Sequence, residues 1–236
     1  MNKTLHRADT RGAAEHGWLS SRHTFSFADY QDHERTRFGL LRVINDDVVH
    51  PSGGFGTHPH ENMEIVSVPL EGELRHQDSM GNTQHIRAGE VQIMSAGTGI
   101  THSEFNASDS ADVKFLQIWV FPKERDIEPR YDQKLFTAEE RANRLQVVVS
   151  PDATDAGVRI NQDAWFVRGD FRAGEGGRYD VKKPGNGVYL FVIEGSVDVA
   201  GESLERRDGL GIEAVADFEF AATADSQLLF IEVPMG

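Results

Sequence analysis

Hydrophobic and polar positions alternate in short stretches along most of this chain. From residue 38 onward, runs rich in Val, Ile, Leu and Phe are separated by turns that contain Gly, Asn or Asp. This pattern is typical of an antiparallel all-β protein. The clearest predicted strands are 38–45, 64–70, 90–95, 114–121, 145–150, 164–171, 188–193 and 227–233.

Helical patterns are few in this sequence. The best candidate is 137–144, where Thr137 and Glu140 have the spacing of a capping box. It follows a turn-prone segment around Pro129, and we expect it to lead into the second half of the chain.

The two halves of the chain are weak repeats of each other. The segments 68–74 and 191–197 share a strand and turn around Gly72 and Gly195. In each half an Arg/Gly turn and an apolar strand follow, and the half closes on a strand that ends in proline. The sequence therefore predicts a duplicated β-barrel, with domains 1–136 and 137–236.

The histidines are distributed very unevenly between these halves. All 10 lie within the first 102 residues, and imidazole is the commonest metal-binding side chain. His58 and His60 are two residues apart, and so are His102 and Glu104. On an extended strand such pairs point to one face, so two facing pairs would supply three imidazoles and a carboxylate. An isolated pair of this kind is more often a surface or core feature, and the two pairs together carry the metal interpretation.

The repeat also predicts what the second half offers at the same positions. The turn glycines Gly72 and Gly89 of the first half correspond to Gly195 and Gly209 of the second. At the same distances from these glycines, the counterparts of His58, His60 and His102 are Val181, Lys183 and Ala222. None of these can replace an imidazole at neutral pH. We therefore expect the second barrel to lack a metal site.

Charge and composition exclude several other classes of function. The net charge of -14 repels phosphate backbones and anionic membranes, so neither nucleic acid nor a membrane is an expected partner. The chain has no cysteine, so any metal must use His, carboxylate and water. No apolar stretch resembles a signal peptide or a membrane span, and we expect a cytoplasmic protein.

Several motifs resemble those of a known family. Gly99, His102 and Asn106 fit the cupin pattern G-x2-H-x3-N. More narrowly, the chain closely resembles the pirin family, especially the bacterial pirin-like quercetinases. The stretches that carry this resemblance are 23–30, 42–47, 56–60, 76–81 and 92–104. They cover most of the first 135 residues, whereas the resemblance over the last 90 is mainly architectural.

The resemblance implies a bicupin, in which two antiparallel β-barrel domains of the double-stranded β-helix or jelly-roll type form one chain. The N-terminal barrel would bind one divalent transition metal through His58, His60, His102 and Glu104. Iron is the expected metal, with Ni, Co, Cu, Mn and Zn compatible with the same ligands. General cupins often take their carboxylate from the position of Ile65. Glu64 is one residue away and would face the opposite side of the strand, so we expect it to have a supporting role.

The resemblance also implies quercetin 2,3-dioxygenase activity, in which a flavonol-like substrate and O2 react with release of carbon monoxide. Glu104 would bind the metal and act as the candidate general base for the 3-hydroxyl proton. The alternative is a non-catalytic, metal-binding and redox-responsive regulatory or interaction protein. A third reading makes quercetin a surrogate for another enolisable aromatic compound. A monomer is favoured over a homodimer, because a duplicated barrel already covers the face that single cupins often bury.

Other conspicuous residues receive less specific interpretations. His76 and Asp78 either steady a ligand histidine or bond within their own turn, and His23 is expected to be a buried, satisfied histidine. Asp46 and Asp47 are expected in a turn. The aromatic residues expected in the core rather than at a substrate site are Phe25, Phe27, Tyr30, Trp119 and Phe121.

Overall fold

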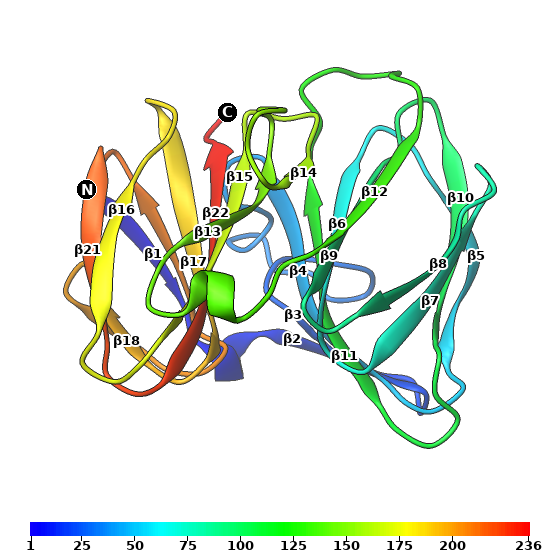
Figure 1. The fold of residues 1–236 in the computed structure, drawn as a ribbon, viewed down its shortest axis with the longest axis horizontal. Coiled ribbons are helices and arrows are strands. Elements are labelled where there is room, and N and C mark those ends of the chain that lie inside the picture. The colour runs from blue at the N-terminus through cyan, green and yellow to red at the C-terminus, as the bar shows by residue number, and fades with distance from the viewer.

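The computed structural model describes residues 1–236, which form two halves placed side by side (Figure 1). Each half contains a seven-stranded and a four-stranded sheet, which are antiparallel except for the parallel pair β13 and β14. We call these pairs of sheets the first and the second barrel. In the first barrel the strand orders are β12-β9-β6-β11-β4-β3-β2 and β5-β10-β7-β8. In the second they are β1-β20-β17-β22-β15-β13-β14 and β16-β21-β18-β19.

The strands of the first barrel are β2 (Gly12–Glu15), β3 (Leu19–His23), β4 (Leu41–Val49), β5 (Gly54–His60), β6 (Glu64–Glu71), β7 (Glu73–Asp78), β8 (Thr83–Arg87), β9 (Glu90–Ser95), β10 (Ile100–Asn106), β11 (Val113–Val120) and β12 (Arg130–Leu135). Those of the second are β1 (Asn2–His6), β13 (Gln146–Ser150), β14 (Val158–Arg159), β15 (Trp165–Phe171), β16 (Gly176–Asp180), β17 (Asn186–Glu194), β18 (Val197–Val199), β19 (Glu202–Leu204), β20 (Gly209–Glu213), β21 (Asp217–Ala222) and β22 (Ser226–Pro234). Two short 3-10 turns, η1 (Ala8–Thr10) and η2 (Glu139–Arg141), complete the regular structure.

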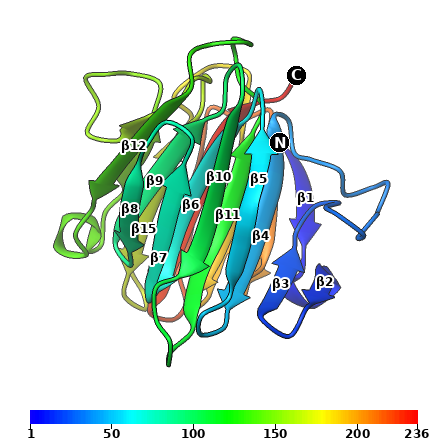
Figure 2. The ribbon, with the colours of Figure 1, turned by 90° about the vertical axis from the view of Figure 1, so that its right-hand side faces the viewer.

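The two large sheets have equivalent strand orders, but one edge strand of the second sheet comes from the start of the chain rather than from its second half. β12 pairs with β9 in the first barrel, whereas its counterpart in the second, β1, comes from the start of the chain and pairs with β20. Figure 2 shows β1 beside β2 and β3 at one side of the molecule. The sequence pattern did not reveal these three strands. The predicted division at residues 136 and 137 stays a prediction, to which this exchange adds that β1 serves the second sheet.

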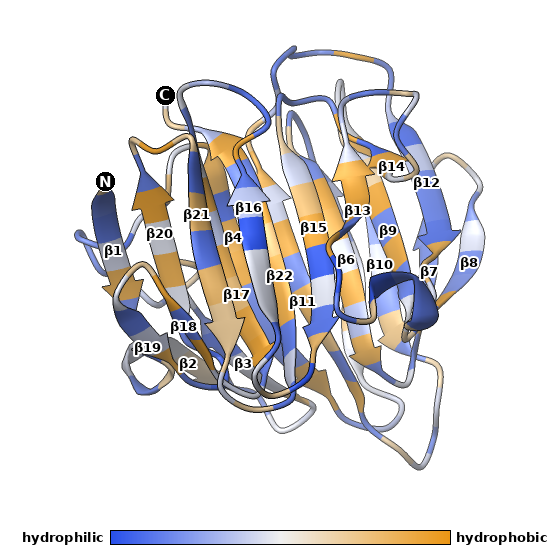
Figure 3. Ribbon diagram, turned by 60° about the vertical axis from the view of Figure 1, so that its left-hand side comes forward, coloured by the Kyte–Doolittle hydropathy of each residue, from blue (hydrophilic) through white to orange (hydrophobic).

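The hydrophobic core lies mainly between the two large sheets. A cluster of 24 buried residues joins strands of both barrels there, among them Val66 and Ile118 from the first and Phe166 and Tyr189 from the second. Figure 3 shows hydrophobic positions recurring along β15, β17 and β22. Burial of both faces of these central strands explains why their sequences read as nearly continuous apolar runs. This shared core holds the two barrels together.

The interiors of the two barrels are filled very differently. The second barrel contains a cluster of 16 buried hydrophobic residues. The first barrel has only two small clusters, of six and four buried hydrophobic residues. Its interior therefore has room for polar side chains.

Most predicted strands are present with shifts of one to three residues at their ends. β9 has the predicted bounds, and β6, β11, β13, β15, β17 and β22 extend or shift their predictions slightly. The strand predicted at 38–45 begins only at Leu41 and continues to Val49. Asp46 and Asp47 therefore lie within a strand, and the prediction of a turn there was wrong. Both carboxylates are paired by partners distant in sequence, because Asp46 accepts from Arg11 and Arg207, and Asp47 accepts from Ser21.

The helix predicted at 137–144 was also largely wrong, because only the single 3-10 turn η2 forms there. The predicted cap does exist, since Glu140 Oε2 accepts a hydrogen bond from the Thr137 backbone N–H at 3.1 Å. The segment offers few apolar side chains to bury on a helix face, and Asn143 adopts a positive φ of 52° that ends the turn. The capping interaction alone is therefore not enough to form a helix, because helices in proteins are stabilised mainly by the packing of an apolar face.

Candidate metal centre

The three histidines of the predicted site lie together on two neighbouring strands of the first barrel. His58 and His60 are on β5, and His102 is on β10, where it pairs directly with His58. One donor atom from each of the three lies within 4.8 Å of the others. The imidazole centroids are 4.5 to 4.9 Å apart. Two-residue spacing on extended strands brings these rings together, as expected from the sequence.

Local backbone irregularities shape this cluster. The register between β10 and β5 shifts between His102 and Glu104, where an extra residue of β5 forms a bulge. Bulges of this kind commonly redirect side chains next to functional sites. Just before β10, Gly97 has a φ of +47°, and a Cβ there would collide with the backbone carbonyl of Ile127. Only glycine fits this tight turn.

Burial keeps the imidazoles of His60 and His102 neutral. Burial, followed by the neighbouring His58 and His60, lowers the pKa of His102 to about 2, and burial followed by His58 lowers the pKa of His60 to about 4. His102 is 2% exposed, and neither of its ring nitrogens has a hydrogen-bond partner. Buried polar atoms are rarely left without a partner. A divalent metal needs unprotonated imidazole nitrogen, so these histidines fit such a ligand.

Glu104 lies beside His102 in the interior of the same barrel. Its carboxylate accepts hydrogen bonds from Ser67 Oγ at 3.2 Å and from Gln117 Nε2 at 2.8 Å. Burial raises its pKa to about 7, and these two hydrogen bonds oppose the shift. A carboxyl group with this pKa can bind a metal as carboxylate or exchange a proton near neutral pH.

His76 is the polar neighbour whose role the sequence left open. It is fully buried, and its Nε2 lies 3.1 Å from Asp78 Oδ2. Donor atoms of His76, His102 and Glu104 form a second group within 4.8 Å. Asp78 also accepts hydrogen bonds from the backbone of its own turn, including Asn82 N–H at 3.0 Å. The turn thus fixes Asp78, and Asp78 in turn holds the His76 ring next to the cluster.

A cavity of about 210 Å³ adjoins the histidines and Glu104. Its aromatic walls are Phe27, Phe55 and Trp119, and the Trp119 ring centroid is 5.0 Å from that of His60. Phe27 therefore lines the cavity and belongs to no core cluster, contrary to the expectation. Trp119 lines the cavity but also packs against a small core cluster, and Phe25 is in the core as predicted. Phe55 was missed, because a single aromatic residue between glycines gave no clear signal.

The polar wall of this cavity includes Asn45 and Asp47 of β4. Asp47 is 3% exposed, and Ser21 donates a hydrogen bond to its Oδ1. Burial raises the pKa of Asp47 to about 7. The Oδ1 of Asn45 has no hydrogen-bond partner. An outer depression of about 410 Å³, lined by His60, Glu61 and Thr101 among others, lies beside this inner cavity.

Two other polar residues that the sequence analysis considered, Glu64 and His23, lie outside the cluster. Glu64 faces the second barrel, where its Oε2 accepts hydrogen bonds from Ser95 Oγ at 2.8 Å and from the Asn161 N–H at 3.0 Å. His23 is buried as expected, but its Nδ1 has no hydrogen-bond partner. Neither residue contributes a donor to the two groups described above.

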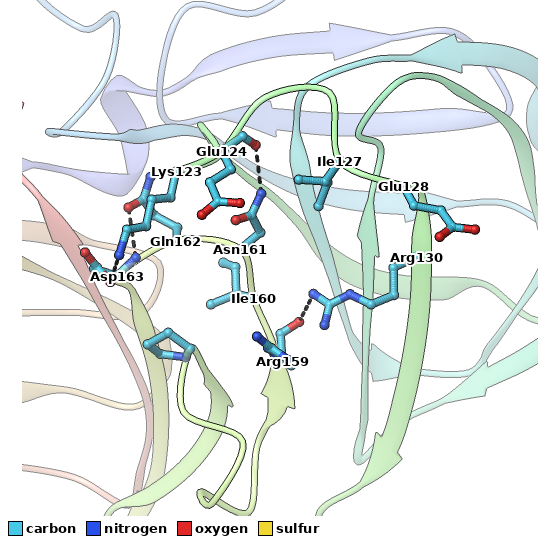
Figure 4. Close-up of a pocket in the computed structure, with 11 residues that line it drawn as sticks. Lys123, Glu124, Ile127, Glu128, Arg130, Arg159, Ile160, Asn161, Gln162 and Asp163 are labelled. Atoms are coloured by element: carbon cyan, nitrogen blue, oxygen red, sulfur yellow. Dashed lines mark hydrogen bonds and ion pairs between the residues drawn. The ribbon is translucent and has the colours of Figure 1, made fainter.

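A cleft of about 480 Å³ between the barrels provides a useful contrast (Figure 4). Its polar groups already bind one another across the interface. Lys123 Nζ lies 3.0 Å from Asp163, and Asn161 donates to the Glu124 carbonyl at 2.8 Å. Arg130 Nη2 donates to the Arg159 carbonyl at 2.7 Å. These contacts hold the two barrels together, and we call the cleft lined by these residues the clasp.

Strand pairing corrects the counterparts assigned to the histidines. Leu74 and Val197 each follow their turn glycine by two residues, and they pair with Asn106 and Ala222. Ala222 is therefore the counterpart of Asn106, and its assignment to His102 was wrong. The assignments failed because the connecting loops differ in length between the halves.

The corrected counterparts are aromatic residues. Counting back along β10 and β21, His102 corresponds to Phe218 and Glu104 to Phe220. Tyr179 pairs with Phe218 as His58 pairs with His102. The errors were even numbers of residues, so the predicted and actual counterparts share a face. The second barrel accordingly has no histidine and no metal-binding cluster at these positions.

Known proteins resemble this chain along most of its length. The family model described as Pirin matches residues 5–120, and the model described as Quercetinase C-terminal cupin domain matches residues 147–233. The chain is 44% identical over 230 residues to the quercetin 2,3-dioxygenase of Escherichia coli (strain K12), covering 98% of each. It is 38% identical over 225 residues to a pirin-like protein of Caulobacter vibrioides, covering 95% of this chain and 96% of that protein.

A solved structure is also very similar. The crystal structure of bacterial pirin YhhW from Escherichia coli in complex with nickel(II) superposes with a TM-score of 0.94 at 42% identity, and the match covers 99% of each chain. Finally, the structure contains no helix of the length and hydrophobicity needed to cross a membrane.

Proposed function

This chain belongs to the pirin family, and on that premise we propose that it is a metal-dependent quercetin 2,3-dioxygenase whose active site is the interior of the first barrel. The observations that carry the proposal are the cluster of His58, His60 and His102 and the second group, which joins His102 to Glu104. His58, His60 and Glu104 also line the aromatic cavity. The similar proteins named as quercetin 2,3-dioxygenases support it.

The metal would be held by the three imidazoles and the Glu104 carboxylate. This ligand set suits a divalent first-row metal and leaves room for further ligands in an octahedral shell. We propose iron as the resident metal, and the solved structure of a bacterial pirin in complex with nickel(II) supports a divalent metal. When bound, the metal supplies Lewis acidity and a site at which the flavonol and O2 meet.

Glu104 has two tasks in this proposal. As carboxylate it would bind the metal, and by loosening from the metal it would accept the proton of the flavonol 3-hydroxyl. The hydrogen bonds from Ser67 and Gln117 hold both carboxylate oxygens, so the side chain stays in position while its charge changes.

The cavity wall would bind and orient the substrate. Phe27, Phe55 and Trp119 offer flat apolar surfaces for aromatic rings and exclude water. The inner cavity of about 210 Å³ is smaller than typical ligand pockets of roughly 300 to 1,000 Å³. We therefore propose that one ring system enters it and the remainder extends into the outer depression. Asn45 and Asp47 would receive the hydroxyl groups of the inserted ring.

The second barrel is a structural partner in this proposal, and the chain acts as a monomer. The shared core of 24 buried residues already covers the large-sheet face of each barrel. An enzyme of this kind can therefore complete its active site within one chain.

Turnover of quercetin tests the proposed function. Purified protein loaded with Fe(II) should consume quercetin and O2 and release carbon monoxide, and His60→Ala should abolish all three. Turnover that survives this substitution or full metal removal would contradict the proposal. The regulatory alternative would be favoured by stable metal binding without flavonol turnover, together with a partner protein that binds this chain in only one oxidation state of the metal.

A further inference from the structure

Two buried arginines lie at the interface between the barrels, in a groove that shares no lining residue with the clasp in Figure 4. Arg168 of β15 is 3% exposed, and Arg141 of η2 is 6% exposed. Both line a groove of about 400 Å³ formed by residues of both barrels. No residue of the metal cluster lines this groove.

The strand pattern explains why Arg168 points toward the first barrel. Val167 and Phe171 belong to the core inside the second barrel, whereas Phe166 belongs to the core between the barrels. Side chains alternate along a strand, so Arg168 shares the face of Phe166. The guanidinium is therefore directed into the interface region rather than into the second barrel.

The hydrogen bonds of the two arginines differ. Arg141 Nε donates to Asp170 Oδ2 at 2.7 Å, and its Nη1 donates to the Phe136 carbonyl at 3.0 Å. The Nε and Nη1 of Arg168 have no hydrogen-bond partner. The Asp170 carboxylate is hydrogen-bonded to Arg141 only; its Oδ1 has no hydrogen-bond partner, and its charge partly offsets that of Arg168. Arg168 therefore has no hydrogen-bonded counter-ion. Leaving a buried cation unpaired is unfavourable unless something binds it.

The local charge balance defines what could bind. Two arginines and one aspartate leave one excess positive charge, in a chain whose net charge is -14. Burial, followed by repulsion from Arg141, lowers the pKa of Arg168 to about 10, which still leaves it charged at neutral pH. A monoanion would restore neutrality.

The rest of the groove indicates the body of this anion. Pro69, Leu70, Leu135 and Phe136 form apolar walls beside the arginines. Leu135 is 58% exposed and is one of three large hydrophobic side chains left open to solvent. Guanidinium groups bind carboxylates through two parallel hydrogen bonds. We propose that this groove binds a small organic monocarboxylate, with its carboxylate on Arg168 and its apolar part against Leu135 and Phe136.

This proposal does not depend on the proposed dioxygenase function. The comparison with the clasp supports it, because there the side chains of Lys123, Asn161 and Arg130 already have partners across the interface. In the groove, by contrast, a nine-tenths buried cation faces an open volume and lacks such a partner. The two crevices between the same two barrels thus have different roles.

Benzoate is a suitable probe, and benzamide is its neutral control. Titration calorimetry of the metal-loaded protein should give saturable binding of benzoate, with benzamide much weaker. Arg168→Gln should weaken benzoate by about tenfold or more, because a charge-assisted pair is lost, and Arg168→Lys should retain part of the affinity. Arg159→Gln, in the clasp, is the matched control and should bind benzoate as the wild type does.

Two further arms keep the test decisive. Binding should persist in His102→Ala, since a carboxylate that merely coordinates the metal would lose it. If Arg168→Gln does not fold, Leu135→Glu at the exposed rim should still weaken benzoate relative to Leu135→Gln, through charge repulsion. Equal affinity in the wild type, Arg168→Gln and Leu135→Glu, or no benzoate binding at millimolar concentration, would overturn the proposal.

Discussion

The two barrels have equivalent strand orders, but the interior of the first is largely polar and that of the second is apolar. Where the first has His102 and Glu104 on β10, the second has Phe218 and Phe220 on β21. Tyr179, Phe218 and Phe230 stack in the second barrel, with ring centroids 5.1 to 6.3 Å apart. The fold therefore does not require a metal site, and the inward positions of one small sheet decide whether a barrel is filled or reactive.

The difference also shows how the chain distributes stability. The second barrel gains from buried apolar area, roughly 25 cal/mol per Å². The first buries His76, His102 and Glu104 instead, and burying polar groups costs free energy unless they are bound. The shared core between the large sheets lets the filled barrel support the polar one.

The strongest test of this comparison uses two alanine substitutions. One replaces a proposed metal ligand in the first barrel, and the other replaces its counterpart in the second barrel. His102→Ala should remove metal binding and lower flavonol turnover by more than about 100-fold, since substitution even of residues that only support ligands costs 10 to 100-fold. Phe218→Ala should leave metal content intact and cost about 3 to 5 kcal/mol of stability, as is usual for a buried phenylalanine. Metal analysis and denaturant unfolding measure the two outcomes. Metal retained by His102→Ala would break the comparison.

A second test separates the charge of Glu104 from its shape. Glu104→Gln keeps the shape of the side chain, and its one amide oxygen can still accept one of the two hydrogen bonds from Ser67 and Gln117. It can neither accept the substrate proton nor bind the metal as a carboxylate. Turnover should fall by about 100-fold, within the range usual for a general base, while the fold is retained. Phe220→Leu, its counterpart in the second barrel, is the control and should leave kcat unchanged. Nearly equal kcat in Glu104→Gln and wild type would remove the proposed base.

The sequence predicted the parts of this picture that depend on local pattern. The apolar run of β9 and the two-residue spacing of the histidine pairs are visible without a structure. The place of Asp47 in a strand was missed, because its partner Ser21 is 26 residues away. The counterparts of the histidines required strand pairing, since loop lengths differ between the halves.

Other features depend on how distant segments meet. Phe27 lines the cavity rather than packing in the core, because β5 brings Phe55 and His60 opposite it. The exchange of β1 into the second sheet left no local signal, since Asn2–His6 is mostly exposed and polar. Residue spacing predicts which side chains share a face, and only the folded chain determines what that face contacts.

The pH dependence of metal affinity offers a third, smaller test. The pKa of Glu104 is raised to about 7 in the metal-free protein, so protons compete with the metal below that pH. Affinity should rise by up to about tenfold per unit as the pH increases toward 7 and level off above it. His60 and His102 have pKa values of about 4 and 2 and add nothing to this change above pH 6. Competition titration with a chelator between pH 6 and 8 measures it, and an equal slope in Glu104→Gln would show that another group is responsible.

The smallest expected effect concerns the exchanged edge strand. His6 of β1 lies 2.8 Å from the Tyr189 hydroxyl of β17, and both side chains are buried. Tyr189→Phe removes this hydrogen bond and should cost about 1 kcal/mol of stability. Metal affinity and turnover should stay unchanged, because β1 and β17 belong to the second barrel. Urea unfolding measures the loss. If Tyr189→Phe lowered metal affinity instead, the two barrels would be coupled, and their division into a reactive and a supporting half would have to be given up.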